Sequence, residues 1–141
     1  MHGDKIFVDT NILIYAYDVS AGFKNATAVR ILSELWDAGR GVLSTQVLQE
    51  FFVSVTRKIP KPIEDQYAAN IVRDFLRWEL VVNDGDSILE AASLASRYRF
   101  SFWDCLIIQA ALKGGCDILL SEDLSDDQVI ESMRIRNPFK S

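Results

Sequence analysis

The chain has 141 residues, of which 49% are hydrophobic and 25% charged, a balance typical of a globular protein. It contains no run of about 18 apolar residues, and its N-terminus lacks the basic-then-apolar order of a signal peptide, so we expect a cytoplasmic protein with no membrane span. The formal net charge of −5 argues weakly against nucleic-acid binding, because nucleic-acid-binding proteins usually carry a basic surface.

Histidine and cysteine chemistry is largely excluded. His2 is the only histidine and lies at the end of the chain, which removes Ser–His and Cys–His catalytic triads and His-based metal sites. Cys105 and Cys116 are the only cysteines, and neither their spacing nor the expected compartment suits a disulfide or a thiolate zinc site. We expect Cys105 to be a small buried hydrophobic residue.

Short apolar runs alternate with amphipathic segments along the chain. The runs have the character of strands buried in a parallel sheet, and the segments between them carry apolar residues at helical spacing. In chain order we predict a strand over 6–8, a helix or helical turn over 10–17, a helix over 25–38, a strand over 41–44, helices over 44–58 and 62–78, a strand over 80–82, helices over 87–98 and 101–113, a strand over 118–120, a polar loop over 121–128 and an edge strand over 133–139.

Local signals set several of these boundaries. Ser44 or Thr45 is a suitable N-cap for the helix over 44–58, and Pro60 prevents that helix from continuing. Ser87 and Glu90 have the spacing of a capping box. Strands separated by helices are typical of an α/β fold with a parallel sheet, and the absence of repeats or linkers predicts a single domain over residues 1–141.

Four acidic residues are predicted to meet at one edge of this sheet, since the active crevice of an open parallel sheet lies beyond the carboxyl ends of its strands. Asp9 directly follows the first strand, and Asp123 lies three residues past the end of the strand over 118–120. Asp104 is in the first turn of a helix that runs antiparallel to that strand, so it returns to the same edge. Glu50 reaches back toward the edge because helical side chains tilt toward the helix N-terminus, and we expect it to be partly buried.

Such a cluster of carboxylates needs positive charge. At about 4 Å and an effective dielectric constant near 20, each pair of like charges costs roughly 4 kcal/mol. The cluster therefore either binds a cation or takes up protons. Oxygen ligands without His or Cys select Mg²⁺ or Mn²⁺ over zinc, and an acidic magnesium pocket most often serves phosphoryl chemistry.

Each acid also has a structural alternative. Asp9 can cap the helix that follows it, and Asp104 can form a capping box with Ser101. Glu50 can be a solvated helix residue, and Asp123 can be a turn residue. Four further acids lie near the ends of elements, and spacing does not rank them below the chosen four: Asp18, Glu122, Asp126 and Asp127.

The densest basic run also has two interpretations. Arg57, Lys58 and Lys61 could meet a phosphate backbone, or they could form an ordinary solvated face.

Four segments carry a resemblance to a known family: FVDTNILIYAYD (7–18), STQVLQEF (44–51), FWDCLIIQAA (102–111) and LLSEDL (119–124). In this order and spacing they resemble the motifs of PIN-domain proteins, and within that family those of VapC-type toxins from bacterial and archaeal toxin–antitoxin pairs. The resemblance covers nearly the whole chain.

The resemblance implies a three-layer α/β/α sandwich with a central, mostly parallel sheet of four to five short strands. It also implies a Mg²⁺- or Mn²⁺-dependent endoribonuclease that leaves a 5′-phosphate and a 3′-hydroxyl. The family's catalytic, metal-binding acids match Asp9, Glu50, Asp104 and Asp123. Its supporting polar positions match Thr10, Asn11 and Ser121. The partners that the resemblance implies are an RNA substrate, a second copy of the chain in a homodimer, and a small antitoxin bound across the early helices.

The loop after the strand over 118–120 both supports and departs from the family pattern. The family places its last acid two positions after a Ser or Thr, which favours Asp123 over Glu122. It often carries a glycine before the loop glutamine, whereas this chain has SDDQ, so Asp126 and Asp127 add negative charge near the predicted pocket.

Other functions stay open from the sequence. A non-catalytic PIN-like interaction module is disfavoured by the presence of all four acids, and a housekeeping RNA-processing nuclease would share them. A phosphatase of the haloacid-dehalogenase type needs a second Asp two residues after its nucleophile, where this chain has Asn11 after Asp9.

Overall fold

The computed structural model describes residues 4–140, in which pairs of helices separate the first four strands and the last three strands follow one another. The helices are α1 (Thr10–Tyr17), α2 (Phe23–Ala38), α3 (Thr45–Arg57), α4 (Asp65–Phe75), α5 (Gly85–Arg97) and α6 (Phe102–Lys113), with a 3-10 turn η1 (Val19–Ala21) after α1. The strands are β1 (Ile6–Val8), β2 (Gly41–Ser44), β3 (Glu79–Val81), β4 (Ile118–Leu120), β5 (Val129–Ile130) and β6 (Met133–Arg136). Within this range no helix has the length and apolar character needed to cross a bilayer.

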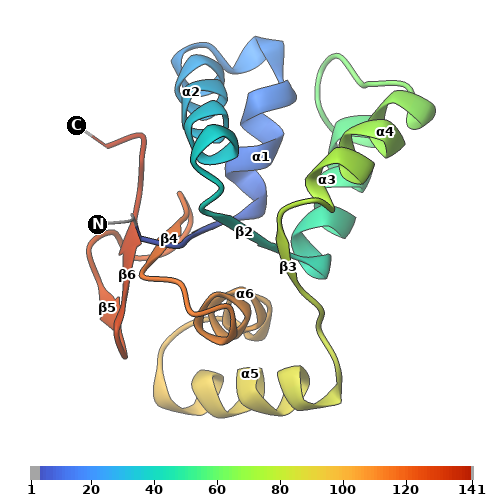
Figure 1. Ribbon diagram of the computed structural model, residues 1–141. Coiled ribbons are helices and arrows are strands. Elements are labelled where there is room, and N and C mark those ends of the chain that lie inside the picture. Colours follow the sequence, from blue (N-terminus) through green and yellow to red (C-terminus); the bar gives the residue numbers. More distant parts are fainter. Residues whose placement is uncertain (1–3, 141) are drawn as a thin grey trace.

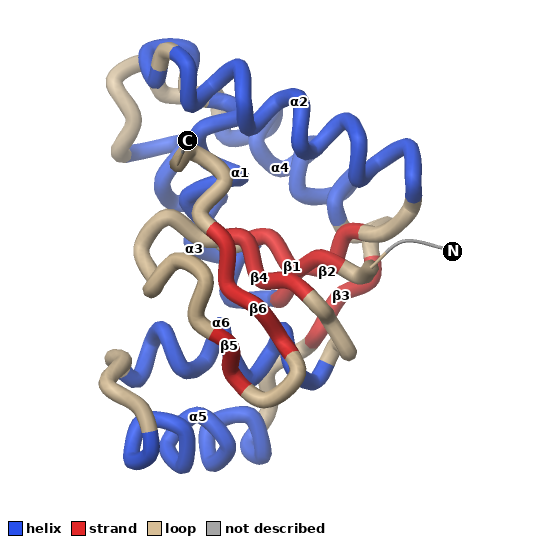
Figure 2. The backbone as a smooth tube through the Cα atoms, turned by 90° about the vertical axis from the view of Figure 1, so that its left-hand side faces the viewer, coloured by secondary structure: helices blue, strands red, loops and turns tan. Residues whose placement is uncertain are grey.

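The strands form one sheet in the order β3-β2-β1-β4-β6-β5. All neighbouring pairs are parallel except β5 with β6. Helices α1 to α4 gather on one side of the sheet, and α5 and α6 lie on the other (Figures 1 and 2). The predicted three-layer α/β/α sandwich with a mostly parallel sheet is therefore confirmed.

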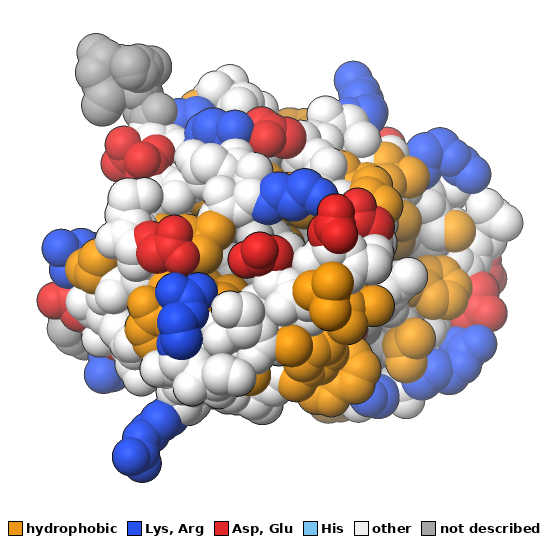
Figure 3. Space-filling view, turned by 90° about the horizontal axis from the view of Figure 1, so that it is seen from below, with side chains coloured by type: hydrophobic (Ala, Val, Ile, Leu, Met, Phe, Trp, Pro, Cys, Tyr) orange, Lys and Arg blue, Asp and Glu red, His pale blue; other side chains and the backbone are white. Residues whose placement is uncertain are grey.

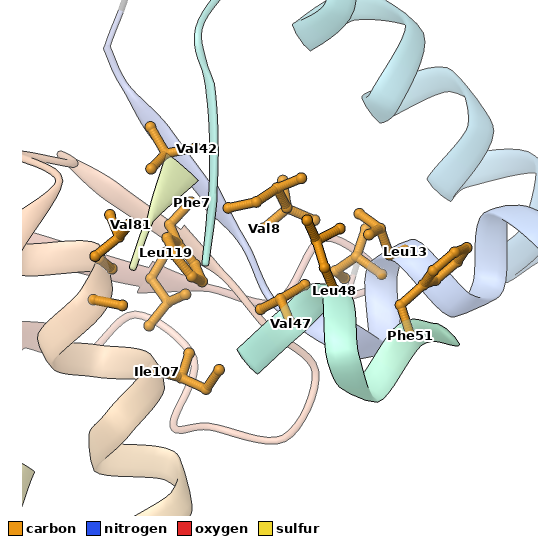
Figure 4. Close-up of a cluster of buried hydrophobic side chains, with 14 of the residues drawn as sticks. Phe7, Val8, Leu13, Val42, Val47, Leu48, Phe51, Val81, Ile107 and Leu119 are labelled. Atoms are coloured by element: carbon orange, nitrogen blue, oxygen red, sulfur yellow. The ribbon is translucent and has the colours of Figure 1, made fainter. Parts of the chain in front are cut away.

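The sheet is covered on both faces, which explains why its central strands are continuous apolar runs. Phe7 and Val8 of β1 point to opposite faces, yet both are fully buried. Figure 4 shows the same arrangement around them, with Leu13 and Phe51 from the α1–α3 side and Ile107 from α6. The core thus extends through the sheet and fixes the positions of the strand ends.

Helix α6 has almost no polar face because it lies between the sheet and α5 (Figure 1). It packs against α5, β2 and β3, and all residues from 105 to 111 are buried. Cys105 is fully buried, as expected. The outer surface of this layer, which Figure 3 shows from below, mixes charged side chains with hydrophobic patches, and Ile88 and Leu89 of α5 are exposed.

Helix starts near the carboxyl edge of the sheet are fixed by side-chain caps. The Asp9 carboxylate accepts a hydrogen bond from Thr10 N at 2.7 Å, and Ser44 Oγ accepts one from Val47 N at 3.3 Å. The capping box of α5 differs from the prediction: it is formed by Asp84 and Ser87, not by Ser87 and Glu90. Asp84 Oδ1 accepts from Ser87 N and Ser87 Oγ accepts from Asp84 N, both at 3.0 Å, so the helix begins earlier, at Gly85.

Other boundaries also shift. Helix α2 begins two residues before the predicted position 25, and α4 is shorter than the predicted 62–78. The chain leaves α4 after Phe75, and the ring of Trp78 then packs beside Phe75, with centroids 5.2 Å apart, and over Gly41. Strand β3 starts one residue before the predicted strand over 80–82.

The C-terminal part of the sheet was only partly predicted. The strand expected over 133–139 is β6, but it is an interior strand and ends at Arg136. The edge strand is β5, whose two residues are too few to give a period-two pattern. The sheet described within residues 4–140 consequently has six strands instead of four to five.

Candidate metal centre and active site

The site lies at the carboxyl ends of β1 and β4, where the chain direction across the sheet reverses. Such a switch point is the usual place for a ligand site in an open α/β sheet. Strands β1 and β4 are neighbours, with Val8 opposite Leu120, and Asp9 N donates to Leu120 O at 3.0 Å. Asp9 and Ser121, the residues that follow the two strands, are thereby placed side by side.

Asp9 is the buried centre of this site, with 9% of its surface exposed. Its carboxylate accepts hydrogen bonds from Thr10 N at 2.7 Å and from Ser121 Oγ at 2.7 Å. Burial raises the pKa of Asp9 from 3.8 to about 6, the negative charges of Asp123 and Glu50 add to the rise, and the two hydrogen bonds oppose it. No cationic side chain is among the groups that act on the pKa of Asp9 within residues 4–140, so ionised Asp9 has no adjacent counter-charge.

Glu50 is held toward this centre by α1. Thr10 Oγ1 donates to Glu50 Oε1 at 2.6 Å, and Gln46 Nε2 donates to Glu50 Oε2 at 3.3 Å. Contrary to our expectation of partial burial, Glu50 is exposed, because the buried face of α3 carries Val47, Phe51 and their neighbours and leaves Glu50 at its border. Glu50 is thus exposed to solvent, as the alternative interpretation of a solvated helix residue predicts. Both of its carboxylate oxygens are nevertheless hydrogen-bonded.

Asp123 is held by α1 and by Ser121 at the end of β4, the same two parts of the chain that hold Asp9. Asn11 Nδ2 donates to Asp123 Oδ2 at 2.9 Å, and Asp123 N donates to Ser121 Oγ at 3.2 Å. Each of the three polar residues matched by resemblance thus contacts at least one of the acids, and Thr10 and Ser121 each contact two. Their hydroxyl and amide groups connect Asp9, Glu50 and Asp123 into one hydrogen-bonded network.

Asp104 is placed differently from the other three acids. Its backbone N donates to Ser101 Oγ at 3.1 Å, but within residues 4–140 its half-buried carboxylate makes no hydrogen bond, so only half of the capping box forms. The first turn of α6 approaches α3 through Gln46, whose Nε2 donates to Trp103 O at 3.5 Å. Asp104 therefore neighbours the network through Gln46, and its charge is not among those that raise the pKa of Asp9.

An open cleft of about 480 Å³ exposes this network to solvent. It is lined by Thr10, Asn11, Ile14, Gln49, Glu50, Val53, Ser54, Lys58 and Asp123. Lys58 contributes a positive charge and forms no salt bridge with another residue between 4 and 140. Its neighbour Arg57 instead pairs with Asp65 through two contacts of 2.8 and 3.1 Å.

Two polar residues of the site were not identified from the sequence: Gln46 and Ser54. A signal for both was present, since Gln46, Glu50 and Ser54 are spaced four apart and so lie along one face of α3, with Lys58 at its C-cap. The sequence identifies Lys58 only as part of a basic run. Of the three basic residues in that run, Lys58 lines the cleft, whereas Arg57 and Lys61 do not.

The competing acids have other partners. Glu122 accepts hydrogen bonds from Tyr15 Oη at 2.6 Å and from Lys24 Nζ. Its burial raises its pKa, but these two hydrogen bonds and the charge of Lys24 outweigh that effect and keep the pKa below its usual value. Glu122 is thus turned toward α1 and α2, where Lys24 balances its charge.

The remaining three acids have structural roles outside the cleft. Asp18 caps η1 by accepting from Ser20 N at 3.0 Å. Asp126 accepts from Asn137 N at 2.8 Å. Asp127 pairs with Arg134 and Arg136 at 2.9 and 3.2 Å, so the charge that we expected near the pocket is balanced by these arginines.

The donor groups fit a hard divalent cation in their chemistry. Carboxylate, hydroxyl and amide oxygens surround the cleft, as Mg²⁺ and Mn²⁺ prefer. Two buried oxygens beside the carboxylates, Asn11 Oδ1 and Gln46 Oε1, accept no hydrogen bond from the described residues. In residues 4–140 no three Asp, Glu, His or Cys side chains converge closely enough to form a ready-made metal site. The residues that would hold a cation are Asp9, Glu50 and Asp123, with Asp104 beyond Gln46.

The raised pKa of Asp9 predicts a pH-dependent stability in metal-free protein. The folded protein holds the Asp9 proton more tightly than the unfolded chain, so the stabilisation is present below about pH 4 and is lost as the pH rises through about 6. The full loss is roughly 3 kcal/mol, since one pKa unit corresponds to about 1.4 kcal/mol. Asp9→Asn should therefore be more stable than wild type by up to this amount near pH 7.5 in EDTA, and similar at pH 4.

Urea unfolding at both pH values measures this difference. Asp37→Asn, which removes an exposed acid of α2, is the matched control and should leave the pH dependence unchanged. An Asp9→Asn protein that is less stable than wild type by the same amount at both pH values would contradict the assigned cost of the buried charge.

Comparisons with known proteins agree with this fold. The family model of the PIN domain matches residues 6–129. Among solved structures, the chain is similar to a toxin–antitoxin complex from Klebsiella pneumoniae, with a TM-score of 0.71, 18% identity, and coverage of 97% of this chain and 100% of that one. It is also similar to DNA-bound VapBC from Salmonella typhimurium, with a TM-score of 0.66, 16% identity, and coverage of 96% and 99%.

A third similar structure is VapC20 of Mycobacterium tuberculosis, described as a toxin that cleaves the sarcin–ricin loop. The TM-score is 0.60, with 20% identity and coverage of 82% of this chain and 87% of that one. A comparison with curated proteins gave no significant match. The match of the family model over most of the chain shows that this protein belongs to the PIN domain family.

Proposed function

We propose that the protein is a divalent-metal-dependent endoribonuclease and the toxin of a type II toxin–antitoxin pair. The observation that carries the proposal is the hydrogen-bonded network of Asp9, Glu50 and Asp123 at the carboxyl ends of β1 and β4. It opens into a cleft and occurs in a PIN-family chain. The family and fold disfavour the phosphatase alternative, which belongs to a different α/β fold.

The residues of the network have distinct roles in this proposal. Asp9, Glu50, Asp123 and Asp104 would hold Mg²⁺ or Mn²⁺, which supplies an activated water and neutralises the charge of the scissile phosphate when bound. Ser121 holds the Asp9 carboxylate, and Thr10 holds that of Glu50. These hydrogen bonds keep the two acids in place against their mutual repulsion. Hydrolysis would leave a 5′-phosphate and a 3′-hydroxyl.

Lys58 supports an extended anionic substrate. It is the C-cap of α3, eight residues after Glu50, which corresponds to about 12 Å at the helical rise of 1.5 Å per residue. Both side chains line the one cleft. An RNA strand bound at the carboxylates could therefore continue along α3 and place another phosphate beside Lys58.

The toxin assignment is supported by the similar solved structures. Two of them are toxin–antitoxin or VapBC assemblies, and VapC20 is described as a toxin that cleaves the sarcin–ricin loop. We accordingly propose a cytoplasmic protein that forms a homodimer and is bound by a small antitoxin. A short, overlapping upstream reading frame for a DNA-binding protein would favour this assignment over a housekeeping RNA-processing nuclease.

Cleavage of a mixed RNA pool tests the nuclease proposal. Wild type should cleave with Mg²⁺ or Mn²⁺ and lose activity in EDTA, and Asp104→Asn and Glu50→Gln should each lower the rate at least about 100-fold because a cation ligand is lost. Asp126→Asn is the matched control: it changes an exposed acid outside the cleft and keeps an acceptor for Asn137 N. Unchanged cleavage by Asp104→Asn, or no cleavage by wild type with either metal, would contradict the proposal and favour a non-catalytic module.

Lys58→Gln tests the substrate path. We expect KM to rise several-fold with a smaller change in kcat, and the slope of log KM against log salt to decrease by about 0.7, the value for one phosphate contact with a single strand. Lys61→Gln is the control, since Lys61 is exposed and is not part of the cleft lining. Equal effects of the two substitutions would exclude a specific role for Lys58.

A further inference from the structure

Two side-chain amides at the site leave an oxygen without a partner. Asn11 Oδ1 and Gln46 Oε1 are buried and accept no hydrogen bond within residues 4–140. Gln46 has only 8% of its surface exposed, so its oxygen cannot rely on bulk solvent. Buried acceptors are nearly always paired in native proteins, and an exception at a site points to a bound water or ion.

The orientation of both amides is set by their neighbours. Gln46 Nε2 donates to Glu50 Oε2 at 3.3 Å and to Trp103 O at 3.5 Å. A flipped amide would place an oxygen against these two oxygens, which is unfavourable. Asn11 is oriented in the same way, because its Nδ2 donates to Asp123 Oδ2 at 2.9 Å. In each case the NH₂ group donates to an acid of the network, and the carbonyl oxygen has no donor among the described residues.

Gln46 occupies the gap between the two parts of the site. It contacts Glu50 on one side and, through Trp103 O, the first turn of α6 on the other, one residue before Asp104. A purely structural role for Gln46, as a link between α3 and α6, would explain the two hydrogen bonds that its NH₂ group donates. It would not explain why the buried oxygen beside these acids lacks a donor.

We propose that Gln46 Oε1 accepts a hydrogen bond from water carried by the divalent cation, and that Asn11 Oδ1 does the same on the Asp123 side. This inference rests on the proposed metal dependence and adds a prediction of how the cation is bound. Mg²⁺ gives up its waters reluctantly and usually retains several in protein sites. The cluster would thus bind a partly hydrated cation, with the acids supplying charge and the two amides orienting its water.

Two cation probes separate this role from a structural one. Calorimetry with Mn²⁺ measures binding of a cation that can exchange its waters. Hexaamminecobalt(III) does not exchange its ligands, so it can bind only through N–H donors to acceptors such as amide oxygens. Gln46→Met, an unbranched replacement of similar length, should weaken both probes about 10-fold, as loss of a group that supports metal ligands typically does.

Gln49→Met is the matched control, because Gln49 lies on α3 and lines the cleft but is exposed and forms no side-chain hydrogen bond among the described residues. Urea unfolding in EDTA shows whether each variant folds. If Gln46→Met fails to fold, Asn11→Ala tests the second oxygen and should weaken both probes in the same way.

The outcomes distinguish this inference from the proposed function. Wild-type affinity for both probes in folded Gln46→Met, with a loss of stability alone, would mean that Gln46 is only a structural link and would overturn the inference. Failure of the wild type to bind Mn²⁺ would overturn the metal dependence itself. Weaker binding in Gln46→Met and unchanged binding in Gln49→Met would support the assigned role.

Discussion

The burial of the Asp9 carboxylate at the end of β1 is the constraint on which the site depends. The sheet places this group beside Ser121 and within reach of the charges of Glu50 and Asp123, where its ionisation is unfavourable. Thr10 donates hydrogen bonds to Asp9 and Glu50, and Ser121 donates one to Asp9, but neither donor carries a positive charge. The protein thus maintains a negatively charged cluster that a divalent cation would stabilise, at some cost to the stability of the metal-free fold.

The layers of the fold provide the rigidity that this cluster requires. Helix α6 is buried between the sheet and α5, so its apolar residues fix the position of the first turn that carries Asp104. This explains how a carboxylate can belong to a nearly all-apolar helix: Asp104 is at the end of the helix and only half buried, whereas the residues from 105 onward form the core. Figure 1 shows that the α1–α4 layer meets the sheet from the other side, and Glu50 on α3 belongs to this layer, whereas Asp9 follows β1 and caps α1.

Much of this arrangement could be predicted because it depends on strand ends. The apolar runs of β1, β2 and β4 identified the sheet, and the places of Asp9 and Asp123 follow from its carboxyl edge, whereas Ser121 was matched only by the family resemblance. The two-residue β5, the Asp84–Ser87 capping box and the rotation of Glu122 toward Lys24 could not be predicted, since each depends on tertiary contacts that leave little local pattern. The role of Gln46 was missed for a similar reason. Its burial and the direction of its amide follow from the approach of α6 to α3, which are distant in the chain.

The central claim is that the four acids form one cation site although they come from four separate segments. Crystals soaked in Mn²⁺ and measured at the manganese absorption edge test it most directly. We predict an anomalous peak between the carboxylates of Asp9, Glu50 and Asp123, on the side that faces Asp104 and Gln46. Saturating Mn²⁺ with no peak at this edge of the sheet, or with peaks only at other surface acids, would contradict the claim.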